Sequence, residues 1–370
     1  MIYRRMAIER EAPEQLGYDR IKYNLSESSY TDQQLDTTQF DLHKLLLCYG
    51  DHLGNPKLRQ LLANEYDVKP NDVLITAGAA SALFMVATAL LSPKNHLLVT
   101  TPNYATNIET PRTIGCKIDY LRLKIDNNFR LDTDELRQLV EQHRPKLISL
   151  TTPHNPTGAM LSAGDLHLVA ELAEKYDSYV LVDETYRDLA HILLPPLAAT
   201  ISNRFISVSS MSKTYGLPGI RIGWLVCKNK RLMETLLAAK EQIFICNSVV
   251  DEEIAYQTLL KKQQLLPPII ADIKNKLALL TNWLKTEPML DCVLPDGGVV
   301  CFPRINLSIN TKHFYKQLFD KYGTYVGAGN WFDMPDNYFR IGYGWMPNNN
   351  DLQQGLQNIS QTLHELINEK

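Results

Sequence analysis

From about residue 70 the chain alternates short apolar runs with longer stretches in which apolar residues recur every three or four positions. The short runs are nearly continuous in apolar residues, which is typical of strands buried on both faces of a parallel sheet. The longer stretches have the period of helices that bury one face. The expected strands are residues 72–76, 96–100, 147–151, 178–183, 204–209 and 223–227, and the expected helices include residues 81–91, 164–176 and 229–244. This pattern predicts an α/β fold, a three-layer sandwich around a mostly parallel sheet.

The pattern changes after Pro267 and Pro268, where helices and strands no longer alternate regularly. We expect a helix after the two prolines, the strand GGVVCFPRI, the helix HFYKQLFDKY, the strand YFRIGYG and a last helix from Asp351. The residues before about 40 are polar and irregular and cannot form a core alone. We therefore predict an amino-terminal arm (1–40), a large ligand-binding domain (41–265) and a smaller α+β carboxyl-terminal domain (266–370) on which the arm packs.

The composition of the chain limits the kinds of molecule that it is expected to bind. The 370 residues carry a net charge of -3 with no long block of Lys and Arg, so nucleic acid and anionic membranes are not expected partners. The longest apolar run, Ala82–Leu91, is too short to span a bilayer, and the first residues lack the apolar core of a signal peptide. Six cysteines without a CxxC pair suggest neither a zinc site nor a disulfide framework. We expect a cytoplasmic protein that binds small molecules and no metal.

Polar residues directly after the predicted strands are candidates for a binding site, because ligands collect at the carboxyl ends of parallel strands. The first such segment contains Gly78, Ala79 and Ala80 at a helix start, where free backbone N–H groups suit a phosphate or form only a tight turn. Tyr104 follows the second strand and either presents its ring to a flat ligand or packs in the core. Asn155 follows the third strand, and its amide can point at a ligand oxygen.

The DETY segment places Asp183 at the end of a buried strand, where a carboxylate is costly without a cationic partner. Glu184 is the alternative acid, and Tyr186 supplies a phenol. A nucleotide-binding acid and a metal-binding acid of the Walker-B kind are rival explanations. The sequence contains no GxxxxGK[ST] phosphate loop, and its Gly327-Ala328-Gly329 pattern lacks the third glycine of a dinucleotide fingerprint.

Residues 207–224, SVSSMSKTYGLPGIRIGW, place Lys213 among small hydroxyl residues and eight positions before Arg221. A flat, phosphorylated aldehyde bound through a lysine would use this segment and the strand-end residues together. Pyridoxal 5'-phosphate is such a ligand, and its ring nitrogen needs a buried carboxylate such as Asp183. Lys213 would form the Schiff base and then move the proton. The other expected contacts are Tyr104 on the ring face, Asn155 and Tyr186 at the ring oxygen, and Ala79, Ala80, Ser210, Ser212 and Arg221 at the phosphate.

The segments NPTG, DETY, SMSKTYGLPGIRIGW, FRIGYG and YGDHLGNPKLR, which begins at Tyr49, occur in the order and spacing of a known family. In this the chain resembles the fold type I pyridoxal-phosphate enzymes, specifically the class I/II aminotransferases. The resemblance implies that Lys213 is the Schiff-base lysine, that Asp183 pairs with the ring nitrogen and that Arg340 binds the substrate α-carboxylate. It also implies that Tyr49 reaches the phosphate across the interface of a homodimer. The arm segment NLSES places Ser26 near the substrate, with Ser28 where many members have glycine.

The resemblance implies an aminotransferase that moves an amino group between an α-amino acid and a 2-oxo acid. Another enzyme on the same scaffold remains an alternative, such as a β-eliminating lyase or a cyclase like capreomycidine synthase, because the same cofactor residues serve all of them. A non-catalytic sensor is a third hypothesis. Sensors of this kind carry a DNA-binding domain ahead of the fold, and we expect too few residues for one before Tyr49.

Overall fold

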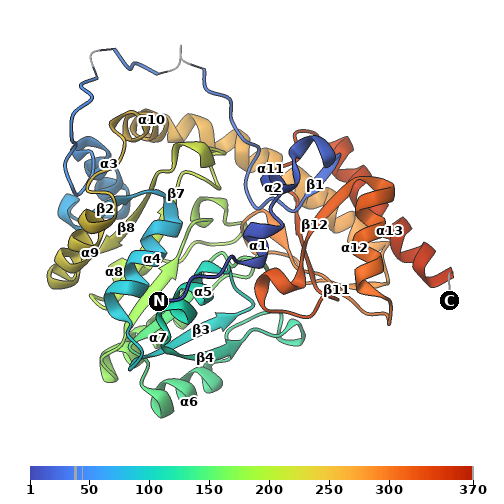
Figure 1. Cartoon of the computed structure of the whole chain (residues 1–370), viewed down its shortest axis with the longest axis horizontal. Coiled ribbons are helices and arrows are strands. Elements are labelled where there is room, and N and C mark those ends of the chain that lie inside the picture. The colour runs from blue at the N-terminus through green and yellow to red at the C-terminus, as the bar shows by residue number, and fades with distance from the viewer. Residues whose placement is uncertain (37–39, 44, 369–370) are drawn as a thin grey trace.

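A seven-stranded sheet forms the centre of the larger lobe of the protein (Figure 1). The computed structural model describes residues 1–36, 40–43 and 45–368. The strand order is β2-β8-β7-β6-β5-β3-β4, and only β8 runs antiparallel to its neighbours. The strands are β2 (Val73–Thr76), β3 (His96–Thr101), β4 (Lys117–Arg122), β5 (Leu147–Thr151), β6 (Tyr179–Asp183), β7 (Phe205–Ser210) and β8 (Gly223–Cys227). The predicted mostly parallel sheet is therefore confirmed.

Strand β4 was not among the predicted strands. Both of its end residues are exposed and only Leu121 is fully buried, because it lies at the edge of the sheet and pairs only with β3 among the described residues. An edge strand does not need the continuous apolar run by which the central strands were recognised.

Successive residues of the central strands point to opposite faces and build two separate cores. Leu98, Ile148 and Val180 pack in one core, whereas their neighbours Leu97, Leu147 and Leu181 pack in the other. The first core is closed by α6 (Thr133–His143), α7 (Ala163–Lys175) and α8 (Ala198–Ile201), and the second by α4 (Gly78–Leu90), α5 (Thr106–Ile114) and α9 (Lys230–Ile243). The predicted three layers follow from this alternation.

The sequence also explains where several helices start. Ser162 caps α7 by accepting from the N–H of Asp165, whose carboxylate accepts in return from the N–H of Ser162. Asp132 accepts from two N–H groups at the start of α6. At the edge of the large domain, α3 (Pro56–Tyr66) and α10 (Val249–Leu260) pack on β2 and β8 in a further apolar cluster.

A four-stranded sheet of order β1-β12-β13-β10 supports the smaller lobe. The arm contributes β1 (Tyr23–Leu25), which pairs in parallel with β12 (Thr324–Ala328), and β13 (Phe339–Gly342) lies between β12 and β10 (Val300–Cys301). The helices α11 (Lys262–Lys285), α12 (Thr311–Tyr322) and α13 (Asn349–Asn368) cover it with a core of their own, and β9 (Leu290–Asp291) and β11 (Arg304–Ile305) form a separate pair. The short helices α1 (Ala7–Arg10) and α2 (Pro13–Leu16) of the arm lie between the lobes (Figure 1).

The domain boundaries remain a prediction. Helix α11 continues through Pro267 and Pro268, so the expected boundary after residue 265 falls inside a helix that begins in the large lobe. The expected end of the arm at residue 40 follows residues 37–39, which lie outside the described residues. In the described part of the chain, no helix combines the length and apolar character needed to cross a bilayer.

Candidate active site

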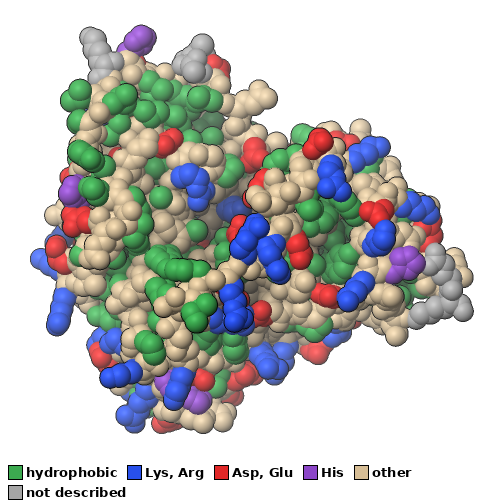
Figure 2. Space-filling view, in the orientation of Figure 1, with side chains coloured by type: hydrophobic (Ala, Val, Ile, Leu, Met, Phe, Trp, Pro, Cys, Tyr) green, Lys and Arg blue, Asp and Glu red, His purple; other side chains and the backbone are tan. Residues whose placement is uncertain are grey.

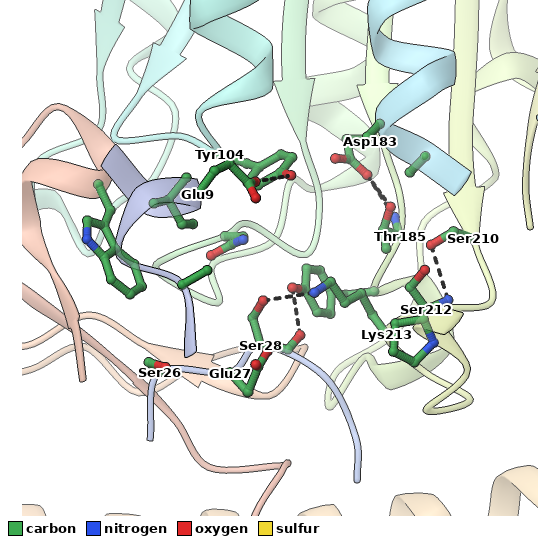
Figure 3. Close-up of a pocket in the computed structure, with 18 of the residues that line it drawn as sticks. Glu9, Ser26, Glu27, Ser28, Tyr104, Asp183, Thr185, Ser210, Ser212 and Lys213 are labelled. Atoms are coloured by element: carbon green, nitrogen blue, oxygen red, sulfur yellow. Dashed lines mark hydrogen bonds between the residues drawn. The ribbon is translucent and has the colours of Figure 1, made fainter. Parts of the chain in front are cut away.

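The carboxyl ends of the parallel strands open onto a cavity of about 210 Å³ between the large sheet, the small lobe and the arm. Figure 2 shows the surface hollowed between the two lobes, and Figure 3 shows the residues inside. The cavity is lined by most of the residues predicted from the sequence: Ser26, Ala79, Ala80, Tyr104, Asn155, Asp183, Tyr186, Ser210, Ser212, Lys213, Arg221 and Arg340. Ser26 and Arg340, which are 314 positions apart in the chain, therefore meet at one site.

Lys213 follows β7 and extends into the middle of the cavity (Figure 3). Its Nζ donates a hydrogen bond to Ser28 Oγ at 3.2 Å. Burial lowers the pKa of the Lys213 ammonium, and the nearby Glu27 carboxylate opposes part of this effect. A lysine in this environment gives up its proton more easily than an exposed lysine, as a nucleophile or a base requires.

Asp183 ends β6 and is 6% exposed. Its Oδ1 accepts from the N–H and the hydroxyl of Thr185, at 3.1 and 2.6 Å, and no lysine or arginine of the described residues forms an ion pair with it. Burial raises the pKa of the Asp183 carboxyl, and the hydrogen bonds from Thr185 partly counter this. The carboxylate is thus ready for a cationic partner supplied by a ligand.

Glu184, the alternative acid, points elsewhere. It does not line the cavity, and its carboxylate pairs with Arg187 at 3.0 Å and accepts from the N–H of Ala198. Its role is to hold the loop after β6 against α8. Of the two neighbouring acids, only Asp183 faces the cavity.

One end of the cavity combines a helix start, hydroxyl groups and an arginine. Ala79 and Ala80 lie at the N-terminus of α4, Ser210 is the last residue of β7, and Ser212 lies in the turn that follows it. Gly78 does not line the cavity, but it has a φ of +76°, and a Cβ at this position would lie 2.7 Å from Arg221 Nη2. Glycine therefore allows the Arg221 guanidinium to approach the helix start, and together these groups suit a phosphate.

A second arginine, Arg340, lines the cavity from β13 of the small lobe. Arg340 is 3% exposed; its Nη1 donates to Asn155 Oδ1 at 3.0 Å and its Nη2 donates to the backbone oxygen of Ser26. Its Nε is buried and has no hydrogen-bond partner among the described residues. The guanidinium also lies over the ring of Phe332, with its Cζ 5.0 Å from the centroid. A buried arginine with an unused donor suits a carboxylate ligand.

Two tyrosines complete the wall. The Tyr186 hydroxyl donates to the backbone oxygen of Ser28 at 2.8 Å, which fixes the arm over the cavity. The Tyr104 hydroxyl donates to Glu9 Oε1 at 3.4 Å. Burial raises the pKa of both phenols to about 12, so both are neutral donors near pH 7.

The sequence analysis missed several lining residues, among them Glu9, Glu14, Glu27, Thr185 and Trp331. Thr185 had a detectable signal, because an aspartate side chain commonly accepts from the backbone N–H two residues further along the chain, as Asp183 does from Thr185. The three glutamates lie in the arm, which has no periodic pattern, and the arm is brought to the site by long-range contacts such as the pairing of β1 with β12 and the hydrogen bond from Tyr186 to the Ser28 backbone.

Tyr49 does not line the cavity of its own chain. It is 79% exposed, next to Leu46 and Leu47 at 74% and 76%. These apolar side chains are thus left on the surface of the single chain, and whether Tyr49 reaches a partner's site remains a prediction.

A group of possible metal ligands lies away from the cavity. His96, Asp119 and His143 meet near the amino ends of β3 and β4, with His96 Nδ1 3.0 Å from Asp119 Oδ2. The sequence analysis expected no metal ligands and did not identify this group. These residues do not line the cavity, which lies at the carboxyl ends of the strands, so they take no part in its chemistry.

Comparison with known proteins agrees with this geometry. The family model described as aminotransferase class I and II matches residues 20–359. Capreomycidine synthase of Streptomyces vinaceus is 28% identical over 345 residues, which are 92% of this chain and 87% of the relative. Arginine–pyruvate transaminase of Pseudomonas aeruginosa is 26% identical over 333 residues, covering 86% of this chain and 83% of the relative.

A crystal structure shows the same fold. A pyridoxal-phosphate-dependent aminotransferase from Streptococcus suis superposes with a TM-score of 0.91 at 28% identity, covering 99% of each chain.

Proposed function

Because the chain belongs to the class I and II aminotransferases, a pyridoxal-phosphate-dependent family, we propose that it transfers an amino group between an α-amino acid and a 2-oxo acid. The resemblance drawn from the sequence motifs is thereby confirmed at the level of the family and its cofactor. The observation that carries the proposal is the meeting of Lys213, Asp183 and Arg340 in one cavity.

The residues present fit pyridoxal phosphate. Asp183 offers a buried carboxylate to a protonated ring nitrogen, and it has no cationic partner among the described residues. Ala79, Ala80, Ser210, Ser212 and Arg221 offer the N–H groups, hydroxyls and positive charge that a phosphate needs. Tyr104 would contact the ring, and Asn155 and Tyr186 would lie at its oxygen. The bound cofactor supplies an electron-withdrawing ring that stabilises negative charge on the substrate α-carbon.

Lys213 and Arg340 have different roles in the proposed reaction. Lys213 would hold the cofactor and, as a free amine, would take and return a proton at its Nζ, which burial makes easier to deprotonate. Arg340 binds the substrate α-carboxylate, with Asn155 and the Ser26 backbone fixing its guanidinium. The arm, held by Tyr186, limits the access of water to the reacting atoms.

We also propose that the functional unit is a homodimer in which Tyr49 reaches the partner's phosphate site. The exposed apolar residues around Tyr49 support an interface here, since Leu46 and Leu47 have no place in the core of the single chain. A symmetric dimer would bury this surface twice, once in each chain.

A lyase or cyclase is the second candidate. The observation in its favour is the 28% identity to capreomycidine synthase over 92% of the chain. A second observation is the position of Ser28, whose hydroxyl accepts a hydrogen bond from Lys213 and so lies beside the amine proposed to transfer the proton.

The reaction products distinguish an aminotransferase from a lyase or cyclase. Holoenzyme incubated with a single α-amino acid and no oxo acid should release about one equivalent of oxo acid per chain and no ammonia. A second 2-oxo acid should then be converted to its amino acid. Sustained release of ammonia would instead indicate elimination, and a cyclised product without oxo acid would indicate a cyclase.

A further inference from the structure

We propose that the amino-acid substrate of this site carries a positive charge at the end of its side chain. The inference deepens the proposed function and rests on it. Its basis is a set of three carboxylates that line the cavity, Glu9, Glu14 and Glu27, here called the arm carboxylates; Glu9 and Glu27 are partly buried and Glu14 is exposed.

The charges of the cavity do not balance without such a ligand. Its lining contains three basic side chains, and each has a role in the proposed reaction: Lys213 would bond to the cofactor aldehyde as a neutral amine, Arg221 suits the phosphate and Arg340 suits the α-carboxylate. Of the lining acids, Asp183 suits the ring nitrogen. The arm carboxylates are left over, and the lining contains no further cation that could pair with them.

Ion pairs within the chain do not account for these acids either. Among the residues that the structure describes, no lysine, arginine or histidine lies within 4.0 Å of a carboxylate oxygen of any arm carboxylate. Tyr18 donates to Glu27 Oε1 at 3.2 Å and Tyr104 donates to Glu9 Oε1 at 3.4 Å, both through neutral hydroxyls. Polar side chains facing a cavity without a counter-charge are typical of a binding site for a ligand of opposite charge.

Of the arm carboxylates, Glu27 is the one that we expect to interact most strongly with a cationic ligand. Burial raises the pKa of its carboxyl, and the positive charges of Lys213 and Arg340 lower it only in part. A cation arriving beside Glu27 would restore its ordinary ionisation and would gain more from the pair than in open water. In Figure 3, Glu9 and Glu27 lie on the opposite side of Lys213 from Ser210 and Ser212, away from the predicted phosphate end.

The unpartnered Nε of Arg340 is a separate sign of a ligand in the same cavity. This buried N–H group can donate to an anionic ligand, whereas the arm carboxylates would bind a cationic ligand. A zwitterionic amino acid with a cationic side chain supplies both charges in one molecule. An amino acid with an acidic side chain would instead face like charges from Glu9, Glu14 and Glu27.

The test compares L-arginine with L-citrulline, which has nearly the same shape and no side-chain charge. Holoenzyme is mixed with each, and both the dissociation constant and the rate of the first half-reaction are followed through the visible absorption band. L-alanine and L-glutamate serve as references for reaction at the α-carbon. Arginine should be favoured over citrulline by at least roughly fivefold in apparent affinity, and salt should reduce this preference.

Glu27→Gln should remove most of the preference for arginine over citrulline, with both ligands measured on the same variant so that any general effect on binding cancels. Glu174→Gln, an equal change of charge on α7, should leave the preference intact because Glu174 pairs with Arg204 away from the cavity. Equal binding of arginine and citrulline by an enzyme that reacts with alanine would overturn this inference alone. No spectral change with any of the four amino acids would contradict the proposed function, and the inference with it.

Discussion

Arg340 on β13 donates a hydrogen bond from Nη1 to Asn155 Oδ1 at 3.0 Å, and so joins the small sheet to the loop that follows β5 of the large sheet. The same guanidinium reaches the backbone of Ser26 in the arm. One side chain thus connects the three parts of the chain that enclose the cavity.

Replacing Arg340 by Lys should therefore raise KM for α-amino acids while leaving cofactor affinity nearly unchanged. An ammonium cannot reproduce the planar fork, and the loss of a charged hydrogen bond of about 1.5–3 kcal/mol corresponds to a KM increase of roughly ten- to a hundredfold. Steady-state kinetics with several amino acids, beside a cofactor titration, measures both. Arg112→Lys is a suitable control, because Arg112 pairs with Asp333 outside this cavity. An unchanged KM for every amino acid would remove Arg340 from the substrate site.

Asp183→Asn should keep the fold and lose activity by several orders of magnitude, because an amide cannot hold the ring nitrogen protonated. The measurement is kcat together with the circular dichroism spectrum of the purified variant. The matched control is Glu184→Gln, which should lower stability by breaking the contact with Arg187 but should not affect the cofactor in the same way. Near-normal turnover of Asp183→Asn, with loss in Glu184→Gln, would transfer the role to the neighbouring acid.

The rate at which apoprotein attaches pyridoxal phosphate should rise with pH about a midpoint below the ordinary lysine pKa of about 10.4. The reason is that burial lowers the pKa of Lys213, so the reactive neutral amine is present at lower pH. The anionic Glu27 raises this pKa, so Glu27→Gln should move the midpoint lower still. Stopped-flow absorbance across a pH series measures the midpoint. A midpoint at or above the ordinary lysine value would contradict this environment for Lys213.

Mixing two impaired variants tests the shared site. Chains with Tyr49→Phe and chains with Lys213→Ala should each be impaired, whereas a heterodimer places both lesions in one site and leaves the other site intact. Activity should therefore recover on mixing under conditions of subunit exchange. Absence of recovery despite demonstrated exchange, or an active protein that sediments as a monomer, would exclude Tyr49 from a partner's site.

The elements that could be predicted are those with a clear hydrophobic pattern along the chain. The central strands and Asp183 at the end of one of them were predictable because parallel strands read as apolar runs and place polar residues at one edge. Strand β4 was missed because it lies at an edge and lacks such a run.

The arm contacts could not be predicted in the same way. Glu27 reaches the cavity because Tyr23–Leu25 pair with Thr324–Val326, a contact between segments about three hundred residues apart that leaves no local pattern. Nor does sequence spacing show that Lys213 and Ser28 meet, since this contact depends on how the arm crosses the carboxyl end of β7.

The most direct test of the central claim is to reduce the holoenzyme with borohydride and to identify the modified lysine by peptide mass spectrometry. Lys213 should carry the label, and Lys213→Ala should bind cofactor through the phosphate site without labelling or turnover. Lys240 and Lys276 are internal controls, because both are almost fully buried yet neither lines the cavity. Label on Lys213 alone is the predicted result. Label on either control lysine, or turnover by Lys213→Ala comparable to that of the wild type, would contradict the assignment of this cavity as the active site.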